Sequence, residues 1–138
     1  MKFVLDTNHL IGVLKSDPRV RSRVDALPPE EVGIPLLALA EALFGAHRSA
    51  RASENLAAIA RIRGVLPVLP ITDAIVERYA TVRASLAARG RPKGDFDLVI
   101  ACTALEHGAT LLTNDAALKD GDIEGLSVED WLALPNAP

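Results

Sequence analysis

Four acidic residues stand at positions where carboxylates could hold a metal ion. Asp6 and Asp115 each follow a short apolar run, in the stretches VLDTN and LLTND. Glu41 interrupts the apolar stretch PLLALAEALFGA, and Asp97 lies just after the basic loop RPKGD. Four carboxylates brought together repel one another unless cations are present, and oxygen ligands with few histidines select Mg²⁺ or Mn²⁺ rather than zinc. The chemistry that such a set predicts is attack on a phosphate ester by a metal-bound water.

Glu41 is the acid that is hardest to explain by structure alone. On a helix it shares a face with Leu37 and Phe44, and the positions three and four residues away offer no basic partner. A buried carboxylate loses much of its hydration energy unless a cation or hydrogen bonds replace it. The alternatives are a salt bridge to a distant arginine, exposure on a narrow polar strip, or a metal ion.

The other acids also have ordinary structural interpretations. Asp6 and Asp115 could cap the helices that follow their strands. Asp97, in a first helical turn, would face the positive end of the helix dipole, and Asp95 competes with it as the N-cap. Each position taken singly is therefore compatible with a structural role, and only the set of four favours a shared site.

The elements that must position these acids can be predicted from periodicity and helix-breaking residues. Apolar runs predict strands over residues 2–8, 30–34 and 109–113, a doubtful strand over 65–69 and a last short strand with a turn over 125–132. Helices are expected from Thr7 to before Pro18 and over 18–27, 35–48, 53–63, 72–90 and 95–108. This alternation predicts one α/β domain over residues 1–138, with a central, mainly parallel sheet flanked by helices on both faces.

The predicted sheet would bring the acids to one edge, where the carboxyl ends of its strands lie. In open α/β sheets, ligands bind outside the carboxyl ends of the strands. VLDTN and LLTND both end strands, so Asp6 and Asp115 are expected at that edge. Glu41 and Asp97 can reach the same edge from neighbouring helices.

Charge is unevenly distributed along the 138 residues. Residues 48–93 hold nine of the fifteen Lys and Arg residues against three acids, although the whole chain has a net charge of −3. This asymmetry would allow a polyanion to bind the middle of the chain, and the basic loop 91–95 could take part. The alternative is that helices carry these arginines on solvated faces.

Other residue classes restrict the possibilities. No apolar run approaches the roughly 20 residues of a membrane helix, so a soluble, cytoplasmic protein is expected. The single cysteine, Cys102, excludes an internal disulfide and any multi-cysteine zinc site, and its apolar neighbours predict a buried, inert thiol. His9, His47 and His107 show no paired ligand spacing and are interpreted as surface or helix-end residues.

Taken in order, the motifs D-T-N, the glutamate inside an apolar helix, KGDFDLVIA and LLTND resemble the PIN domain. The resemblance is greatest to the toxin subunits of VapBC-type toxin–antitoxin pairs, and it covers nearly the whole chain up to LSVEDW. It maps the acidic site of that family onto Asp6, Glu41, Asp97 and Asp115, and the supporting polar residues onto Asn8 and Thr113. The chain departs from the family after TND, where AALKD replaces a segment that often contains an aromatic residue.

The resemblance implies an activity and partners. A PIN-domain toxin of this type would be a Mg²⁺- or Mn²⁺-dependent endoribonuclease that leaves a 5′-phosphate and a 3′-hydroxyl. It would usually form a homodimer and be silenced by a small VapB-like antitoxin. Asp95 would be a candidate for a supporting carboxylate, and Thr7 and Thr113 would hydrogen-bond the ligands rather than attack the substrate.

Three other classes are alternatives. A haloacid-dehalogenase-like phosphatase also begins with a strand and an aspartate, but its motif D-x-D-x-T needs a second acid that DTNHL lacks. A receiver-like domain would need an adjacent acidic pair at the first strand, which is also missing. The non-enzymatic alternative is an α/β protein-interaction module in which the acids are only caps.

Overall fold

Five parallel strands form the centre of the part of the chain that the structure describes. The computed structural model describes residues 1–133. Its strands are β1 (Phe3–Leu5), β2 (Val32–Pro35), β3 (Val68–Leu69), β4 (Thr110–Leu112) and β5 (Val128–Glu129). They pair in the order β3-β2-β1-β4-β5, and every pairing is parallel. The predicted sheet is confirmed, with β1 at its middle.

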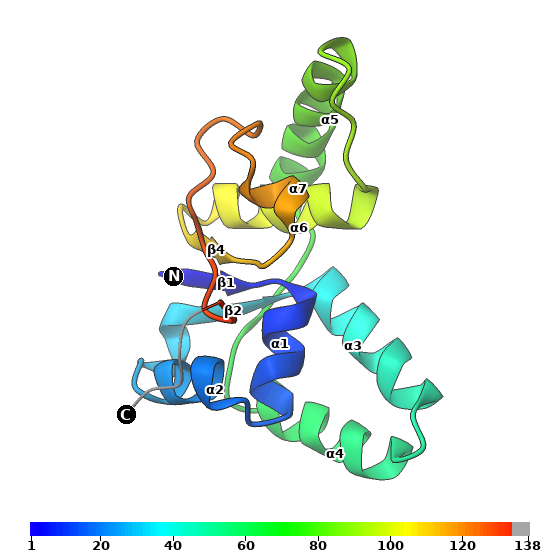
Figure 1. Cartoon of the computed structure of the whole chain (residues 1–138), viewed down its shortest axis with the longest axis vertical. Helices are drawn as coiled ribbons and strands as arrows, with labels where there is room; N and C mark the ends of the chain where they lie inside the picture. The colour runs from blue at the N-terminus through cyan, green and yellow to red at the C-terminus, as the bar shows by residue number, and fades with distance from the viewer. Residues whose placement is uncertain (134–138) are drawn as a thin grey trace.

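Helices cover both faces of this sheet. They are α1 (Thr7–Leu14), α2 (Pro18–Asp25), α3 (Leu36–Arg48), α4 (Ala52–Arg63), α5 (Asp73–Ala88), α6 (Asp95–Glu106) and α7 (Ala116–Lys119), with a 3₁₀ turn at Pro29–Glu31. Figure 1 shows α5 and α6 on one side of the strands and α1, α2 and α4 on the other. The chain therefore has the α/β architecture expected from the alternation of its elements.

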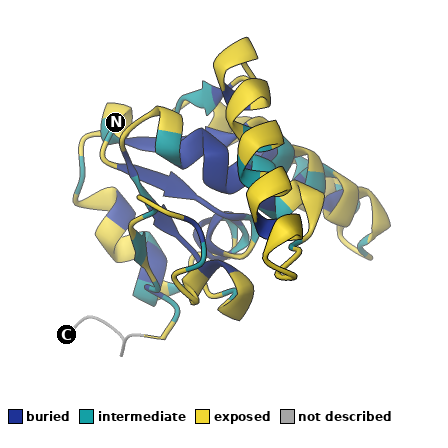
Figure 2. Cartoon of the chain, turned by 90° about the horizontal axis from the view of Figure 1, so that it is seen from above, coloured by how far each residue is buried: buried dark blue, intermediate teal, exposed yellow. Residues whose placement is uncertain are grey.

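The core is aliphatic and lies on the strands. Every residue of β1 and β2 is buried, and Val4, Leu5, Ile34 and Leu111 have no exposed surface. Figure 2 shows most of the sheet as buried and the outward faces of the helices as exposed, while the edge strands β3 and β5 contain residues that are only partly buried or exposed. Strands buried on both faces read as continuous apolar runs because helices cover both sides. These short runs place the residues that directly follow them at one edge of the sheet.

The doubtful strand at 65–69 forms only in part. Val68 and Leu69 pair with Ile34 and Pro35 of β2, at the edge of the sheet. Pro67 stays outside the strand but accepts a hydrogen bond from the Ile34 N–H through its carbonyl oxygen, at 2.9 Å. An edge position tolerates the flanking prolines because one side of the strand needs no ladder hydrogen bonds.

Within residues 1–133, no helix is long and apolar enough to span a membrane. Cys102 is fully buried in α6, and burial raises the pKa of its thiol to about 11. A thiol that stays protonated at neutral pH is unreactive, as the apolar sequence around it predicts.

Candidate active site

Two strand ends meet at the carboxyl edge of the sheet. Leu5 of β1 lies beside Leu112 of β4, and the Asp6 N–H donates to the Leu112 carbonyl oxygen at 3.0 Å. One residue further, the Thr113 N–H donates to the carbonyl oxygen of Glu129 at 3.0 Å. The register thus places the D-T-N and T-N-D segments side by side, as their shared pattern predicts.

Asp6 is a helix cap and is also held by a second group. It is 7% exposed, and its Oδ1 accepts the His9 backbone N–H at 2.8 Å, which caps α1. The same oxygen lies 2.9 Å from Nδ1 of the His9 ring. Asp6 therefore caps α1 through Oδ1, and its other carboxylate oxygen, Oδ2, can still act as a ligand.

Glu41 has a hydrogen-bond partner rather than an ionic one. Its Oε1 accepts the Thr7 hydroxyl at 2.7 Å, across the contact between α1 and α3. Among the described residues, no Lys or Arg forms an ion pair with Glu41. The distant arginine considered from the sequence is therefore not its partner. Thr7, which directly follows Asp6, ties the glutamate to the strand end.

Asp97 and Asp115 approach from α6 and from the start of α7. Asp115 caps α7 by accepting the Ala117 N–H at 2.9 Å, and its own N–H donates to the fully buried Thr113 hydroxyl at 3.1 Å. Asp97 lies half-buried in the first turn of α6. Asp115 is therefore a cap, as the sequence allows, and Thr113 supports the site through it. The N-cap of α6 is Gly94 and no side chain caps that helix, so the interpretation of Asp95 as the N-cap is wrong, whereas Asp97 does lie in the first helical turn.

The electrostatics of Asp97 join the four acids into one cluster. Burial raises the pKa of Asp97 to about 6, and a shared hydrogen bond with Asp115 adds to the rise. The negative charges of Asp115, Glu41 and Asp6 raise this pKa further. The charges of Asp6, Glu41 and Asp115 therefore all act on Asp97 and disfavour its ionised form. An electrostatic link of this kind is what a shared site would require.

The donor set fits a hard divalent cation, although the ligands are not gathered as a closed cage. The four acids supply only carboxylate oxygens, which Mg²⁺ and Mn²⁺ prefer, and no Lys or Arg within residues 1–133 is ion-paired with any of them. No three acidic, histidine or cysteine side chains of the same residues stand in ligating positions around a common point. Binding would therefore draw the carboxylates inward from their present positions.

Asn8 lies at the rim of the cluster. Its side-chain amide donates to the Asn114 Oδ1 at 3.0 Å, so the two asparagines link the starts of the segments that follow β1 and β4. The departure AALKD after TND forms α7, and Lys119 pairs with Asp130 at 2.9 Å. This short helix keeps Asp115 at a helix start even without the aromatic residue.

Two sequence interpretations need correction. His9, interpreted as a surface or helix-end residue, has no exposed surface. Asp95, a candidate supporting carboxylate, accepts the Tyr79 hydroxyl at 2.8 Å and lies 3.4 Å from Arg83, so it is bound to α5 and not to the other acids. The spacing of His9 three residues after a capping aspartate was the signal that could have indicated its contact with Asp6.

The basic loop before α6 is also not free to hold a polyanion. Lys93 has a side chain that is only 4% exposed, and its ammonium lies 2.6 Å from Asp120 and 3.3 Å from Asp122. Arg91 pairs with the same two carboxylates. Lys93 lowers the pKa of Asp120 to about 2, and the hydrogen bond to Asp122 raises the pKa of Arg91. This acid–base cluster fastens the loop leading to Asp97 onto the segment after α7.

Lys93→Met is expected to lower the free energy of unfolding by about 2 kcal/mol, since it removes the nearest cation from Asp120 and one of the two cations paired with Asp122. Urea unfolding at neutral pH measures this loss. Lys15→Met removes an exposed lysine as the control and is expected to change stability by no more than about 0.5 kcal/mol. Equal effects of the two substitutions would show that the cluster around Lys93 does not fasten the loop.

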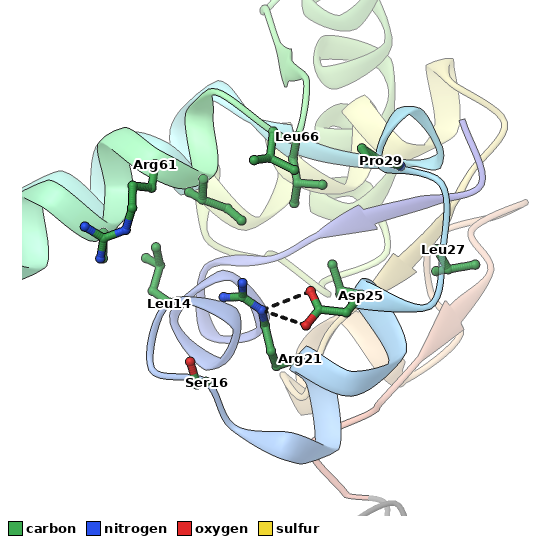
Figure 3. Close-up of a pocket in the computed structure, with 12 residues that line it drawn as sticks. Leu14, Ser16, Arg21, Asp25, Leu27, Pro29, Arg61 and Leu66 are labelled. Carbon is green, nitrogen blue, oxygen red and sulfur yellow. Dashed lines mark hydrogen bonds and ion pairs between the residues drawn. The ribbon is translucent and has the colours of Figure 1, made fainter.

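A cavity of about 540 Å³ lies away from the acids, between α1, α2 and α4. Figure 3 shows the Arg21–Asp25 ion pair on one wall, with Leu14 and Leu66 among the apolar residues around it. None of the four acids lines this cavity. The chemistry that the acids can perform is therefore confined to the edge of the sheet.

The comparisons with known proteins agree on one family. Residues 3–124 match the PIN domain. The tRNA(fMet)-specific endonuclease VapC of Shigella flexneri is 36% identical over 132 residues, covering 95% of this chain and 98% of the relative. Ribonuclease VapC1 of Haemophilus influenzae strain R2866 is 32% identical over 133 residues, with 95% and 98% coverage.

Solved structures agree with these sequence matches. A chain of DNA-bound VapBC from Salmonella typhimurium superposes with a TM-score of 0.85 at 32% identity, covering 95% of this chain and 98% of that one. VapBC-1 from nontypeable Haemophilus influenzae gives a TM-score of 0.80 at 31% identity, with 96% and 99% coverage. These matches favour the ribonuclease interpretation over the phosphatase alternative.

Proposed function

Because the chain belongs to the PIN-domain family, with VapC ribonucleases among its relatives, we propose that it is the ribonuclease toxin of a type II toxin–antitoxin pair. Its reaction is the hydrolysis of RNA phosphodiesters with Mg²⁺ or Mn²⁺ at Asp6, Glu41, Asp97 and Asp115. The observation that carries this proposal is the raised pKa of Asp97, to which the charges of Asp115, Glu41 and Asp6 all contribute at the carboxyl edge of the sheet. Residues 1–138 then act as one nuclease domain.

The roles of the residues follow from their contacts. A bound divalent ion would lower the pKa of a water and offset negative charge on the phosphate. Asp6 offers an oxygen from a carboxylate that its helix and His9 already orient. Thr7, the residue after Asp6, donates a hydrogen bond to Glu41, and Thr113 holds the backbone of Asp115. Asn8 and Thr113 therefore position the site and do not attack the substrate.

The raised pKa of Asp97 gives this residue a particular place in the proposal. With a pKa of about 6, Asp97 is partly protonated just below neutral pH in the metal-free protein. Binding of a cation requires the carboxylate form, so metal uptake releases a proton there. Metal affinity should consequently rise with pH through this range.

The RNA would be held by fewer arginines than the sequence suggests. Of the nine Lys and Arg residues in 48–93, five form ion pairs within the described part of the chain. The others are Arg48, Arg61, Arg63 and Arg89. Arg48 lies at the end of α3, one helix with Glu41, and its guanidinium stands 5.8 Å from the Phe44 ring centre. Arg48 is therefore the one of these four residues that shares a helix with one of the acids, and it is our candidate for a phosphate contact.

The proposed partners are a VapB-like antitoxin and a second copy of the chain. The neighbours from Salmonella typhimurium and Haemophilus influenzae are VapBC complexes. Four large apolar side chains of α3, α5 and α6 are at least 42% exposed: Leu36, Phe44, Val76 and Phe96. Apolar side chains left in water on a small domain favour association with a protein partner.

The proposal predicts metal-dependent cleavage by the purified, antitoxin-free chain. Incubation with a mixed RNA pool in Mn²⁺ or Mg²⁺ should yield fragments with 5′-phosphate and 3′-hydroxyl ends, and a chelator should abolish the cleavage. Cleavage that resists the chelator would contradict the metal role. Absence of cleavage together with absence of Mn²⁺ binding would favour the protein-interaction alternative.

A further inference from the structure

His9 is a buried ring bound at both of its nitrogens. Nδ1 lies 2.9 Å from the Asp6 Oδ1, and Nε2 accepts the backbone N–H of Trp131 at 3.1 Å. A backbone N–H can only donate, so Nε2 carries no proton and Nδ1 carries the single ring proton. His9 is therefore the Nδ1–H tautomer and donates to Asp6.

The second acceptor near Nε2 does not change this assignment. The Asp130 Oδ1 lies 3.8 Å from Nε2, beyond hydrogen-bond distance. That oxygen already accepts the N–H groups of Leu132 and Ala133, at 3.0 and 3.1 Å. The proton-bearing side of the ring thus faces Asp6.

The two bonds from His9 converge on one oxygen of Asp6. Oδ1 accepts both the backbone N–H and the ring Nδ1–H of His9. Two donors at different angles fix the plane of a carboxylate, and a hydrogen-bonded carboxylate is a better-oriented ligand. Among the described residues, none donates a hydrogen bond to Oδ2. The geometry therefore reserves Oδ2 for a ligand at the site.

We propose that His9 is a positioning residue whose tautomer, fixed by the Trp131 backbone N–H, orients the Asp6 carboxylate toward the divalent ion. This inference rests on the proposed metal-dependent function. It adds a requirement that the four acids alone do not show, namely that the segment 128–133 be docked against α1. His9 joins that segment to Asp6.

The segment 128–133 has contacts of its own that hold it in place. The Trp131 ring packs edge-on against Phe3, with ring centres 4.9 Å apart, and it is only 4% exposed. The Arg19 guanidinium donates to the Leu132 carbonyl oxygen at 2.6 Å. These contacts present the Trp131 N–H to His9 without help from the acids. Docking of the chain's last described residues is thereby coupled to the orientation of Asp6.

Two substitutions of His9 each keep one of its two ring hydrogen bonds and remove the other. In His9→Asn, the amide nitrogen replaces Nδ1 and can still donate to Asp6, whereas the acceptor for Trp131 is lost. In His9→Gln, the amide oxygen replaces Nε2 and can still accept from Trp131, whereas the donor to Asp6 is lost. Each variant loses one hydrogen bond, so a purely structural residue would be affected about equally by both.

The test is calorimetric titration of Mn²⁺ into the full chain and both variants, with unfolding curves as a control. We expect His9→Asn to bind Mn²⁺ nearly as the wild type does and His9→Gln to bind about 10- to 100-fold more weakly. Equal affinities, or equal losses in both variants, would overturn the positioning role. A wild type that binds no Mn²⁺ would instead overturn the proposed metal site and this inference with it.

A spectroscopic signature checks the tautomer without metal or RNA. Long-range ¹H–¹⁵N correlation spectra of the metal-free full chain at neutral pH should show His9 Nδ1 protonated and Nε2 bare. A protonated Nε2 would overturn the proposed bridge, because the Trp131 N–H would then have no acceptor on the His9 ring.

Discussion

Asp97→Asn is expected to lower the rate of RNA cleavage in saturating Mn²⁺ by about 100- to 1,000-fold, since loss of a metal ligand removes several kcal/mol of transition-state stabilisation. The protein should nevertheless remain folded, because the substitution removes a half-buried charge that three other acids oppose. Initial rates on a mixed RNA pool, measured at several Mn²⁺ concentrations, give this effect and separate weaker metal binding from slower chemistry.

Asp95→Asn is the matched control for this result. It changes an acid two residues earlier in the same helical turn, but that carboxylate bonds to Tyr79 and Arg83 of α5. The rate should stay close to that of the wild type. If both substitutions reduced cleavage equally, the effect would come from the start of α6 and not from a metal ligand. Equal cleavage by Asp97→Asn and wild type would remove Asp97 from the site.

Rising pH is expected to destabilise the metal-free protein. In the unfolded chain Asp97 loses its proton near 3.8, whereas the folded protein holds that proton up to about pH 6. Between these values the folded state binds more protons, so the free energy of unfolding falls as pH rises and the loss is complete above pH 6. The loss amounts to at most about 3 kcal/mol at neutral pH.

Urea unfolding in a chelating buffer, at several pH values across this window, measures the effect. Asp97→Asn lacks the titrating group and should show a flatter profile, so it should be more stable than the wild type at pH 7. Asp95→Asn should keep the wild-type slope. A wild-type profile no steeper than that of Asp97→Asn would mean that the four acids do not interact strongly.

Mn²⁺ should reverse this loss of stability. A ligand that binds only the folded state adds about 2.7 kcal/mol at a concentration 100 times its dissociation constant. The gain should be larger at pH 7 than at pH 5, because Asp97 must release its proton before it can bind the ion. Removal of the metal should return the protein to its less stable state without unfolding it.

The two predictions share one physical cause. Bringing four carboxylates to one sheet edge costs folding free energy, and either a proton on Asp97 or a bound cation lowers this cost. A site that destabilises the metal-free protein is a common consequence of function. A substitution that improves stability here and abolishes cleavage would therefore support the site more strongly than a loss of activity alone.

The sheet and two of the acids could be predicted from the sequence because local signals suffice for them. The runs before Asp6 and Asp115 are short and mostly apolar, which indicates buried strands, and both are followed by turn-forming polar residues. Parallel pairing then brings the two ends to one edge. Glu41 was indicated by its position in an apolar helix, and its partner turned out to be the Thr7 hydroxyl.

Other features depend on contacts between distant residues and could not be predicted in this way. His9 meets Trp131 across 122 positions of the chain, and Lys93 meets Asp120 and Asp122 across 27 and 29 positions. A histidine or lysine in a polar stretch is ordinarily exposed, and nothing local reveals the backbone N–H or the carboxylate pair that buries it. The sequence therefore suggested that the basic loop binds a polyanion, whereas in the structure its Lys and Arg side chains form ion pairs with Asp120 and Asp122.

The measurement that tests the central claim most directly is a crystal structure of the antitoxin-free protein grown with Mn²⁺, with anomalous differences recorded near the manganese edge. We expect an anomalous peak between Asp6, Glu41, Asp97 and Asp115, with carboxylate oxygens at ligand distance and with the peak lost in Asp97→Asn. A peak elsewhere, or none at a Mn²⁺ concentration that supports cleavage, would contradict the claim that these four acids form the metal centre.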